Sequence, residues 1–340
     1  MQSAIIENRR RNATGNATPL ITKLYYRLKL AIPRAIRVRV RRLVANRLRK
    51  QFSETWPILP QAARRPDGWP GWPNGKRFAF VVTHDVEGAR GLARCRKLAD
   101  LDKALGIRAA FNFVPEGEYH VSDTLRASLV QEGFEVGVHD LHHDGSLYRS
   151  SQHFREQAPR INRYLNVWAA SGFRSGYMFH NLDWLHGLNL LYDTSTFDID
   201  PFEPQPDGVG TIFPFWVQGN CSKGYVELPY TLPQDFTLFM LLRETTIDLW
   251  LKKLDWVASH GGMALVIIHP DYISFDGKPD SSEYPADLYE RFLKYVITRY
   301  GDTCWYALPR EVAAFAAEIK PRLVQHSSYS HRPDGNGRRT

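Results

Sequence analysis

The sequence predicts an α/β fold, in which a parallel sheet closes into a TIM-like barrel with helices outside it. From residue 77 onward, short apolar runs alternate with helical patterns, and this alternation is typical of parallel sheets. Polar clusters follow several of the apolar runs, at the strand ends where such barrels place their sites. An apolar fraction of 43% in 340 residues suits one large globular domain or two smaller ones.

The expected strands are the apolar segments 77–83, 108–114, 134–139, 172–177, 190–197, 211–217 and 263–269. Helical periodicity occupies the segments 91–105, 122–132, 151–170, 244–260 and 285–300. We therefore expect a barrel over residues 77–320, preceded by a Pro/Trp/Gly-rich lead-in at 56–76 and a basic helical arm at 1–55. A polar tail, 321–340, is expected to be disordered.

The arm carries the positive charge of the chain. Residues 1–50 contain fourteen Lys or Arg and a single acid, Glu7, whereas the net charge of the whole chain is only +8. The barrel is therefore mildly acidic, and no nucleic-acid partner is expected. Apolar and basic residues interleave in 19–52 with a break at Pro33. This pattern fits peripheral contact with an anionic membrane or with a partner protein, or else a solvated helix packed on the barrel.

The location is expected to be cytoplasmic, with peripheral contact to the inner face of the membrane as a further option. The three cysteines are far apart and form no CxxC motif, which is typical of a reducing compartment. No apolar run reaches 18 residues, and the first residues lack the apolar core of a signal peptide.

The first polar cluster ends the segment "FAFVVTHDVE". Asp85 and Glu87 are two residues apart, so they share a face of an extended strand. Two neighbouring carboxylates repel each other unless a cation lies between them. The pair therefore indicates either a metal site or a polar strand end that faces water.

The second cluster is "VHDLHHDG" at 138–145. His139 and His143 are four residues apart, and on a helical turn this spacing points both imidazoles the same way, as in many metal sites. Imidazole and carboxylate together suit Zn²⁺ or a similar ion. His142 is an alternative ligand, and a polar loop with hydrogen-bonded histidines is the alternative to a metal site.

Two further strands end in residues that can take part in catalysis. His269 follows the apolar run "ALVII", and Arg174 lies in "GFRSGY", where it can clamp a carboxylate and keep it ionised. A structural histidine and a surface ion pair are the simpler interpretations. The sequence has no GxSxG, no GxxxxGK[ST] and no complete GxGxxG motif, so serine-hydrolase, P-loop and Rossmann sites lack their signatures.

In this order the clusters resemble the motifs of the NodB-homology polysaccharide deacetylases, carbohydrate esterase family 4, in the branch whose first motif is Asp-Val-Asp or Asp-Val-Glu. The resemblance covers roughly residues 77–310 and implies a distorted (β/α)7 barrel. It implies that Asp85 is the general base, that Arg174 orients it and that His269 is the general acid. It also implies a metal held by Glu87, His139 and His143, and an oxyanion bound by the backbone N–H of Tyr177.

The sequence departs from the family pattern at two of these places. Glu87 is one methylene longer than the usual aspartate, and Gly176 stands where the family has a proline, which is expected to loosen the segment before Tyr177. The aspartate that supports the acid histidine is not evident from the sequence. The candidates are Asp193, Asp198 and Asp271.

The resemblance implies a metal-dependent hydrolase, with Zn²⁺ as the expected ion, that removes N-acetyl groups from an amino-sugar polysaccharide or a glycan precursor. Aromatic side chains near the strand ends are expected either to stack on sugar rings or to pack in loops: Tyr177, Phe179, Trp216 and Tyr272. One alternative is a metal-dependent hydrolase of another C–N bond, in a cyclic amide or ureide. Another is a carbohydrate-binding protein with weak or no activity, whose basic N-terminal arm contacts a polysaccharide-assembly partner at the membrane.

Overall fold

The computed structural model describes residues 34–219 and 223–322, so most of the predicted arm and tail lie outside the described residues. The chain divides into two units, Met1–Arg47 and Leu48–Thr340. Helix α3 (Arg34–Gln51) begins directly after Pro33, and the predicted break at that proline lies outside the described residues. None of the helices in the described residues is both long and apolar enough to cross a membrane.

One sheet contains nine of the described strands, and it confirms the predicted parallel architecture. Its strands are β1 (Phe78–Val86), β2 (Ala109–Phe113), β3 (Glu135–His139), β4 (Gly172–Arg174), β5 (Tyr192–Asp193), β6 (Phe215–Gln218), β7 (Gly224–Glu227), β8 (Met263–Ile268) and β11 (Cys304–Tyr306). A separate two-stranded ladder joins β9 (Ile273–Ser274) to β10 (Tyr284–Pro285).

Strand β1 is central to this sheet. Its residues 79–84 pair with β8, while on its other side it pairs first with β11 and then with β2. The order continues through β3, β4, β5, β7 and β6, and only the β6–β7 pair is antiparallel. Backbone N–H groups of Thr231 and Leu232 donate to the Leu265 carbonyl of β8, so the segment after β7 links the two ends of the sheet. The strand ends that carry the predicted site therefore open on one side.

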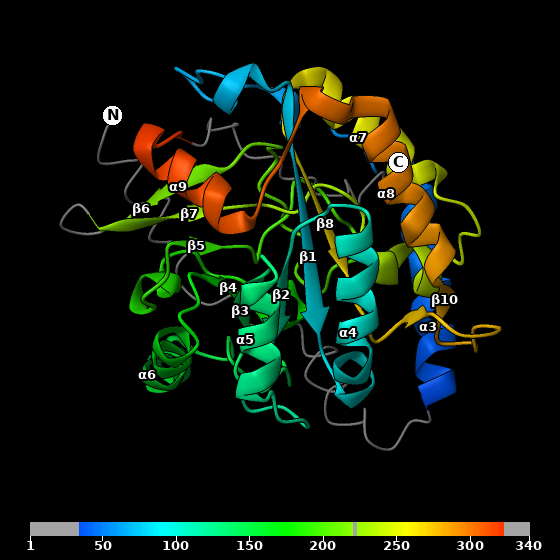
Figure 1. Ribbon diagram of the computed structural model, residues 1–340, viewed down its shortest axis with the longest axis horizontal. Coiled ribbons are helices and arrows are strands. Elements are labelled where there is room, and N and C mark those ends of the chain that lie inside the picture. Colours follow the sequence, from blue (N-terminus) through cyan, green and yellow to red (C-terminus); the bar gives the residue numbers. More distant parts are fainter. Residues whose placement is uncertain (1–33, 220–222, 323–340) are drawn as a thin grey trace, which may run out of the picture. The chain divides into compact units, whose positions relative to one another are not determined.

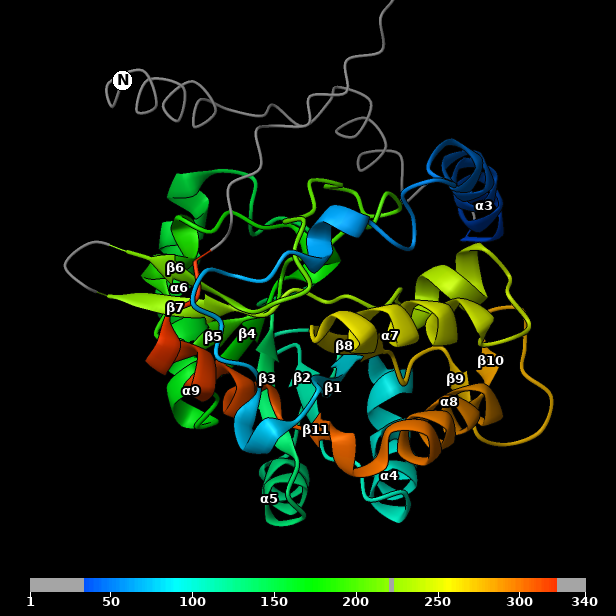
Figure 2. The same cartoon turned by 90° about the horizontal axis from the view of Figure 1, so that it is seen from above.

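Helices surround these strands, and the β6–β7 hairpin lies at the far side of the sheet from α8 (Figures 1 and 2). The helices are α4 (Ala89–Ala104), α5 (Asp123–Gln131), α6 (Ser151–Val167), α7 (Asp248–His260), α8 (Ala286–Tyr300) and α9 (Pro309–Ile319). Shorter turns are η1 (Pro60–Ala63), η2 (Pro73–Gly75), η3 (Gly176–Met178), η4 (Trp184–Gly187), the π-helical η6 (Phe236–Leu241) and η7 (Gly301–Thr303). The sequence prediction missed β7, β9, β10, β11 and α9.

Local sequence explains where these helices begin and end. The hydroxyl of Ser122 accepts from the backbone N–H of Leu125 at the start of α5, and the hydroxyl of Ser150 caps α6 in the same way. Gly261 ends α7 in the left-handed conformation, with φ of 74°, which glycine adopts without a steric penalty.

The core is built around β1 and β8, whose residues are all buried. A strand that is covered on both faces reads as a continuous apolar run rather than an alternating one, and the two runs "FAFVV" and "MALVII" have this form. Inside the barrel, Val81 and Leu265 pack in one cluster with Trp72 of the lead-in and Val312 of α9. The apolar part of β1 thereby fixes the place where its polar end emerges.

Candidate active site

Asp85 lies near the end of β1, on the same face as Thr83, and is almost completely buried. The side-chain amide of Asn112 on β2 donates to Asp85 Oδ1 at 2.9 Å, and Arg174 Nη1 donates to the same oxygen at 2.8 Å. Oδ2 takes no hydrogen bond from the described residues. One oxygen of this carboxylate is therefore anchored, and the other remains available to a reacting group.

Arg174 connects the strand ends. Its side chain is fully buried at the end of β4, where Nη1 also donates to the Thr83 hydroxyl at 2.8 Å and Nε donates to the Thr194 carbonyl at 3.1 Å. Its own backbone carbonyl accepts from Asp140 N at 2.7 Å and lies 3.1 Å from His139 Nδ1. One residue thus holds both the carboxylate of β1 and the loop that follows β3.

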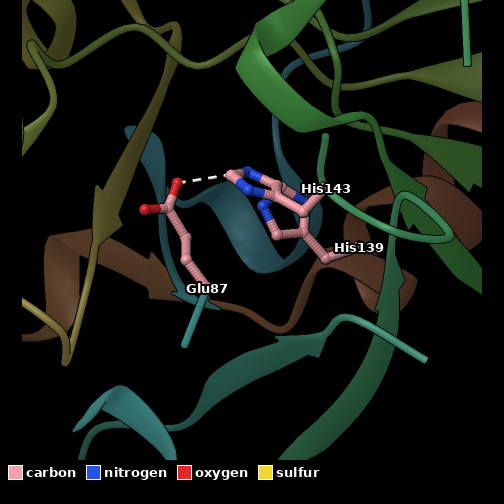
Figure 3. A group of neighbouring side chains, drawn as sticks. All are labelled: Glu87, His139 and His143. Atoms are coloured by element: carbon pink, nitrogen blue, oxygen red, sulfur yellow. Dashed lines mark ion pairs between the residues drawn. The ribbon is translucent and has the colours of Figure 1, made fainter. Parts of the chain in front are cut away.

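The structure brings Glu87, His139 and His143 together, although they come from the ends of two different strands (Figure 3). Their potential ligand atoms all lie within 4.8 Å of one another, and His143 Nε2 is 3.2 Å from Glu87 Oε1. His142, the alternative ligand, does not join this group. Its Nδ1 lies 3.0 Å from the Glu116 carbonyl.

This group has the features of a metal site. His139 Nε2 is buried and has no hydrogen-bond partner among the described residues. The contact between His139 Nδ1 and the Arg174 carbonyl places the proton on Nδ1 and leaves the lone pair of Nε2 for a ligand. Two imidazoles with one carboxylate, and a position left open, are a donor set that catalytic zinc sites use.

His139 and His143 do not lie on a helical turn, the conformation in which a four-residue spacing points two side chains the same way. Residues 141–145 form bends, and both Asp140 (φ 58°) and His143 (φ 53°) have left-handed backbones. The histidine rings nevertheless converge, with centroids 4.7 Å apart. Non-glycine residues in this region cost about 1–3 kcal/mol each and concentrate at functional sites.

His269 lies across the group, directly after β8, with Nε2 3.8 Å from Glu87 Oε1. Its Nδ1 is 2.6 Å from Asp235 Oδ1, and its backbone N–H donates to Asp235 Oδ2 at 2.8 Å. The support for His269 therefore comes from Asp235. The three candidates from the sequence bond other groups: Asp193 bonds Ser195, Asp198 bonds Lys253, and Asp271 accepts from the backbone N–H of Glu87.

The turn at Gly176–Met178 adjoins the histidines. The Tyr177 ring stacks on the His143 ring with centroids 4.9 Å apart and an interplanar angle of 19°. The backbone N–H of Gly176 donates to Asp140 Oδ2 at 3.1 Å, and a Cβ on Gly176 would lie 2.5 Å from that oxygen. Glycine at this position bonds the turn to the loop after β3. It supplies an N–H that proline lacks and makes room for Asp140.

The surroundings of the titratable groups in the site shift their pKa values in different directions. Burial raises the pKa of Asp85, but Arg174, with help from nearby histidines, outweighs burial and lowers that pKa to about 2. Burial lowers the pKa of His139 to about 4, so this imidazole is neutral and able to bind a metal. Burial also lowers the pKa of His269, but Asp235 outweighs that effect and raises it to about 10.

Three of the four aromatic residues predicted to lie near the strand ends are close to the site. Tyr177 and Phe179 lie on the histidine side, with ring centroids 6.1 Å apart, and Tyr272 lies next to His269 with centroids 5.5 Å apart. Trp216 on β6 is instead partly buried and packs against the core cluster that contains Val81 and Leu265. His84 is a core residue that contacts Asp102 of α4 at 2.6 Å.

Sequence reasoning missed three polar residues of the site, which are Asn112, Asp140 and Asp235. Asn112 had a usable signal, because it is the one polar residue inside the apolar run "AAFNFV". Asp140 lies within the recognised histidine cluster, but its two bonds to the backbone N–H groups of Leu141 and Gly176 depend on the loop conformation.

No family model and no curated protein matches this chain. Solved structures do match. A candidate polysaccharide deacetylase from Mycobacterium smegmatis aligns over 78% of this chain and 98% of its own length, with 18% identity and a TM-score of 0.59. This match confirms the deacetylase-type barrel expected from the motifs, at the level of the fold.

Two other solved structures align with lower scores. A peptidoglycan deacetylase from Bacillus subtilis covers 73% of this chain and 97% of its own, with 14% identity and a TM-score of 0.43. A family 4 carbohydrate esterase from Streptomyces lividans in complex with acetate covers 68% and 92%, with 12% identity and a TM-score of 0.39.

Replacing Gly176 by alanine is expected to destabilise the protein by about 1–3 kcal/mol, because the added methyl group overpacks Asp140 and His143. Chemical denaturation measures this change. Gly187→Ala is the control, since its Cβ would meet its nearest neighbour at 3.8 Å, and a change within about 0.5 kcal/mol is expected. Equal stability of the two variants would contradict the steric role of Gly176.

Proposed function

We propose that this protein is a metal-dependent hydrolase that removes N-acetyl groups from an amino-sugar polysaccharide or a glycan precursor. One observation carries the proposal: Asp85, held by Arg174, and His269, held by Asp235, flank a three-residue group with the donor set of a metal site. A purely binding role would not need an anchored acid and an anchored base on either side of that group.

Glu87, His139 and His143 are the residues that would hold the ion, and their nitrogen and oxygen atoms favour Zn²⁺. When bound there, a divalent ion supplies Lewis-acid polarisation of the acetyl carbonyl and acidifies a water molecule. Asp85 lies outside the group that could hold the ion, and Arg174 and Asn112 anchor its Oδ1.

The proton transfers follow from the two anchored groups. Asp85 is ionised at neutral pH, so its Oδ2 accepts the proton of the attacking water. His269 is protonated at neutral pH because Asp235 binds its Nδ1 side, and Nε2 donates a proton to the departing amine. The backbone N–H of Tyr177, in the turn beside His143, would stabilise the oxyanion of the tetrahedral intermediate.

We also propose that helix α3 contacts an anionic membrane surface. Three apolar side chains at positions i, i+3 and i+4 are largely exposed: Val40 by 52%, Leu43 by 72% and Val44 by 52%. Residues at this spacing form one stripe along a helix, and the sequence around them is rich in arginine. A basic helix with an exposed apolar stripe fits the interface of an anionic bilayer.

If Asp85 is the general base, Asp85→Asn should lower the rate of acetate release from N-acetylated chito-oligosaccharides by about 10²–10⁴-fold. This range is the usual contribution of general base catalysis. Acetate is measured in a coupled assay after Zn²⁺ is added to the metal-free protein. Bound Zn²⁺ should stay equal in both proteins, since Asp85 is not a ligand. Equal rates for wild type and variant would refute the assignment.

If His269 is the general acid, the Asp235→Asn variant should have a shifted pH–rate profile. His269 acts while it is protonated, so activity is present below its pKa and is lost as pH rises through that pKa. Removing the Asp235 carboxylate lowers the pKa of His269, so the high-pH limb of kcat/KM should move to lower pH by roughly 1–3 units. An unchanged limb would show that another group supplies the proton.

The membrane proposal predicts that the double variant Leu43→Ser/Val44→Ser binds anionic vesicles at least about tenfold more weakly than wild type, because burial of such side chains stabilises by about 1.5–3 kcal/mol each. Co-sedimentation with phosphatidylglycerol vesicles measures the affinity. Val130→Ser on α5 is the matched control, since Val130 is also exposed, and it should bind like wild type. Failure of wild type to bind, or equal binding to neutral phosphatidylcholine vesicles, would overturn the proposal.

A further inference from the structure

The longer carboxylate at position 87 has a partner that the proposed mechanism does not use. The hydroxyl of Tyr272 donates to Glu87 Oε2 at 2.9 Å, while Glu87 Oε1 faces His143 Nε2 at 3.2 Å. The two oxygens of one carboxylate therefore have separate neighbours. One is engaged by a phenol, and the other faces the imidazoles.

The neighbouring residue, Asp271, holds the backbone of the same glutamate. Asp271 Oδ2 accepts from Glu87 N at 2.9 Å, and Oδ1 accepts from Gly91 N at 3.1 Å near the start of α4. Consecutive residues of the loop after β8 thus fix Glu87 at both its backbone and its carboxylate. A glutamate side chain loses conformational entropy when it is fixed, so prior fixation favours ligand binding.

Tyr272 is itself held firmly. Its backbone N–H donates to the His269 carbonyl at 3.1 Å, and its carbonyl accepts from Tyr284 N at 2.8 Å in the ladder of β9 and β10. Its ring packs against Phe236 with centroids 5.1 Å apart. The hydroxyl group therefore has a defined position from which to orient the carboxylate.

We propose that Tyr272 is a positioning residue that compensates for the extra methylene of Glu87 by holding Oε2, so that only Oε1 is presented to a metal bound by His139 and His143. This inference rests on the proposed metal site. It assigns no chemical step to Tyr272. A shorter aspartate at position 87 would not reach the phenol, so the tyrosine and the glutamate act as a matched pair.

The test measures Zn²⁺ affinity by competition with a chromogenic chelator, independently of hydrolysis. Tyr272→Phe keeps the ring packing and removes only the hydroxyl, and it should weaken Zn²⁺ binding by about 10–100-fold, as loss of a group that orients a ligand does. Tyr225→Phe is the matched control, because its phenol donates to the Leu182 carbonyl at 2.9 Å, away from the site. It should bind Zn²⁺ like wild type.

A double-mutant cycle separates orientation from a general loss of structure. In the Glu87→Asp background, Tyr272→Phe should change Zn²⁺ affinity by less than about twofold, because the contact no longer exists. An equal loss in both backgrounds would overturn the pairing. Zn²⁺ binding with unchanged affinity in Tyr272→Phe overturns this inference alone, whereas wild type that binds no Zn²⁺ overturns the proposed function as well.

Discussion

The buried ion pair between Arg174 and Asp85 is the interaction on which the site depends. Removing one partner of such a pair leaves an uncompensated charge, which costs about 3–5 kcal/mol, so each side chain stabilises the position of the other. The backbone carbonyl of Arg174 also accepts from the backbone N–H of Asp140 and contacts Nδ1 of His139. The position of the proposed base and the orientation of a proposed ligand are therefore set by one residue at the end of β4. A shift of that strand would move both.

Strain in the backbone is concentrated around the same place. Asp140, His143, Tyr177 and Met178 all have positive φ angles without being glycine, and each such residue costs about 1–3 kcal/mol. The surrounding bonds hold them in place: Asp140 binds the N–H of Gly176, and the ring of Tyr177 stacks on His143. The loop after β3 and the turn after β4 consequently support each other. Gly176 lies at their contact, where any side chain would separate them.

The barrel and the residues that follow its long apolar strands could be predicted from the sequence, because an apolar run buried on both faces is a strong signal and parallel strands end on the same side. Asp85, Glu87 and His269 were found in this way. Asp235 could not be, because it follows β7, a four-residue strand of the β6–β7 hairpin that carries no such run. Asp193, Asp198 and Asp271 are also carboxylates, but each bonds a different partner. Only the three-dimensional fold decides which aspartate reaches His269. The role of Gly176 likewise could not be predicted, because it depends on the conformation of the loop after β3, which leaves no periodic pattern in the sequence.

The same residue type acquires opposite properties within this site, and its surroundings explain the difference. His139 and His269 are both buried at strand ends, yet the pKa of the first falls to about 4 and that of the second rises to about 10. His139 meets a backbone carbonyl and another imidazole, so burial dominates, whereas His269 meets a carboxylate on its Nδ1 side. A neutral imidazole suits a metal and a charged one suits proton donation. Asp235 therefore distinguishes the proposed acid, His269, from His139.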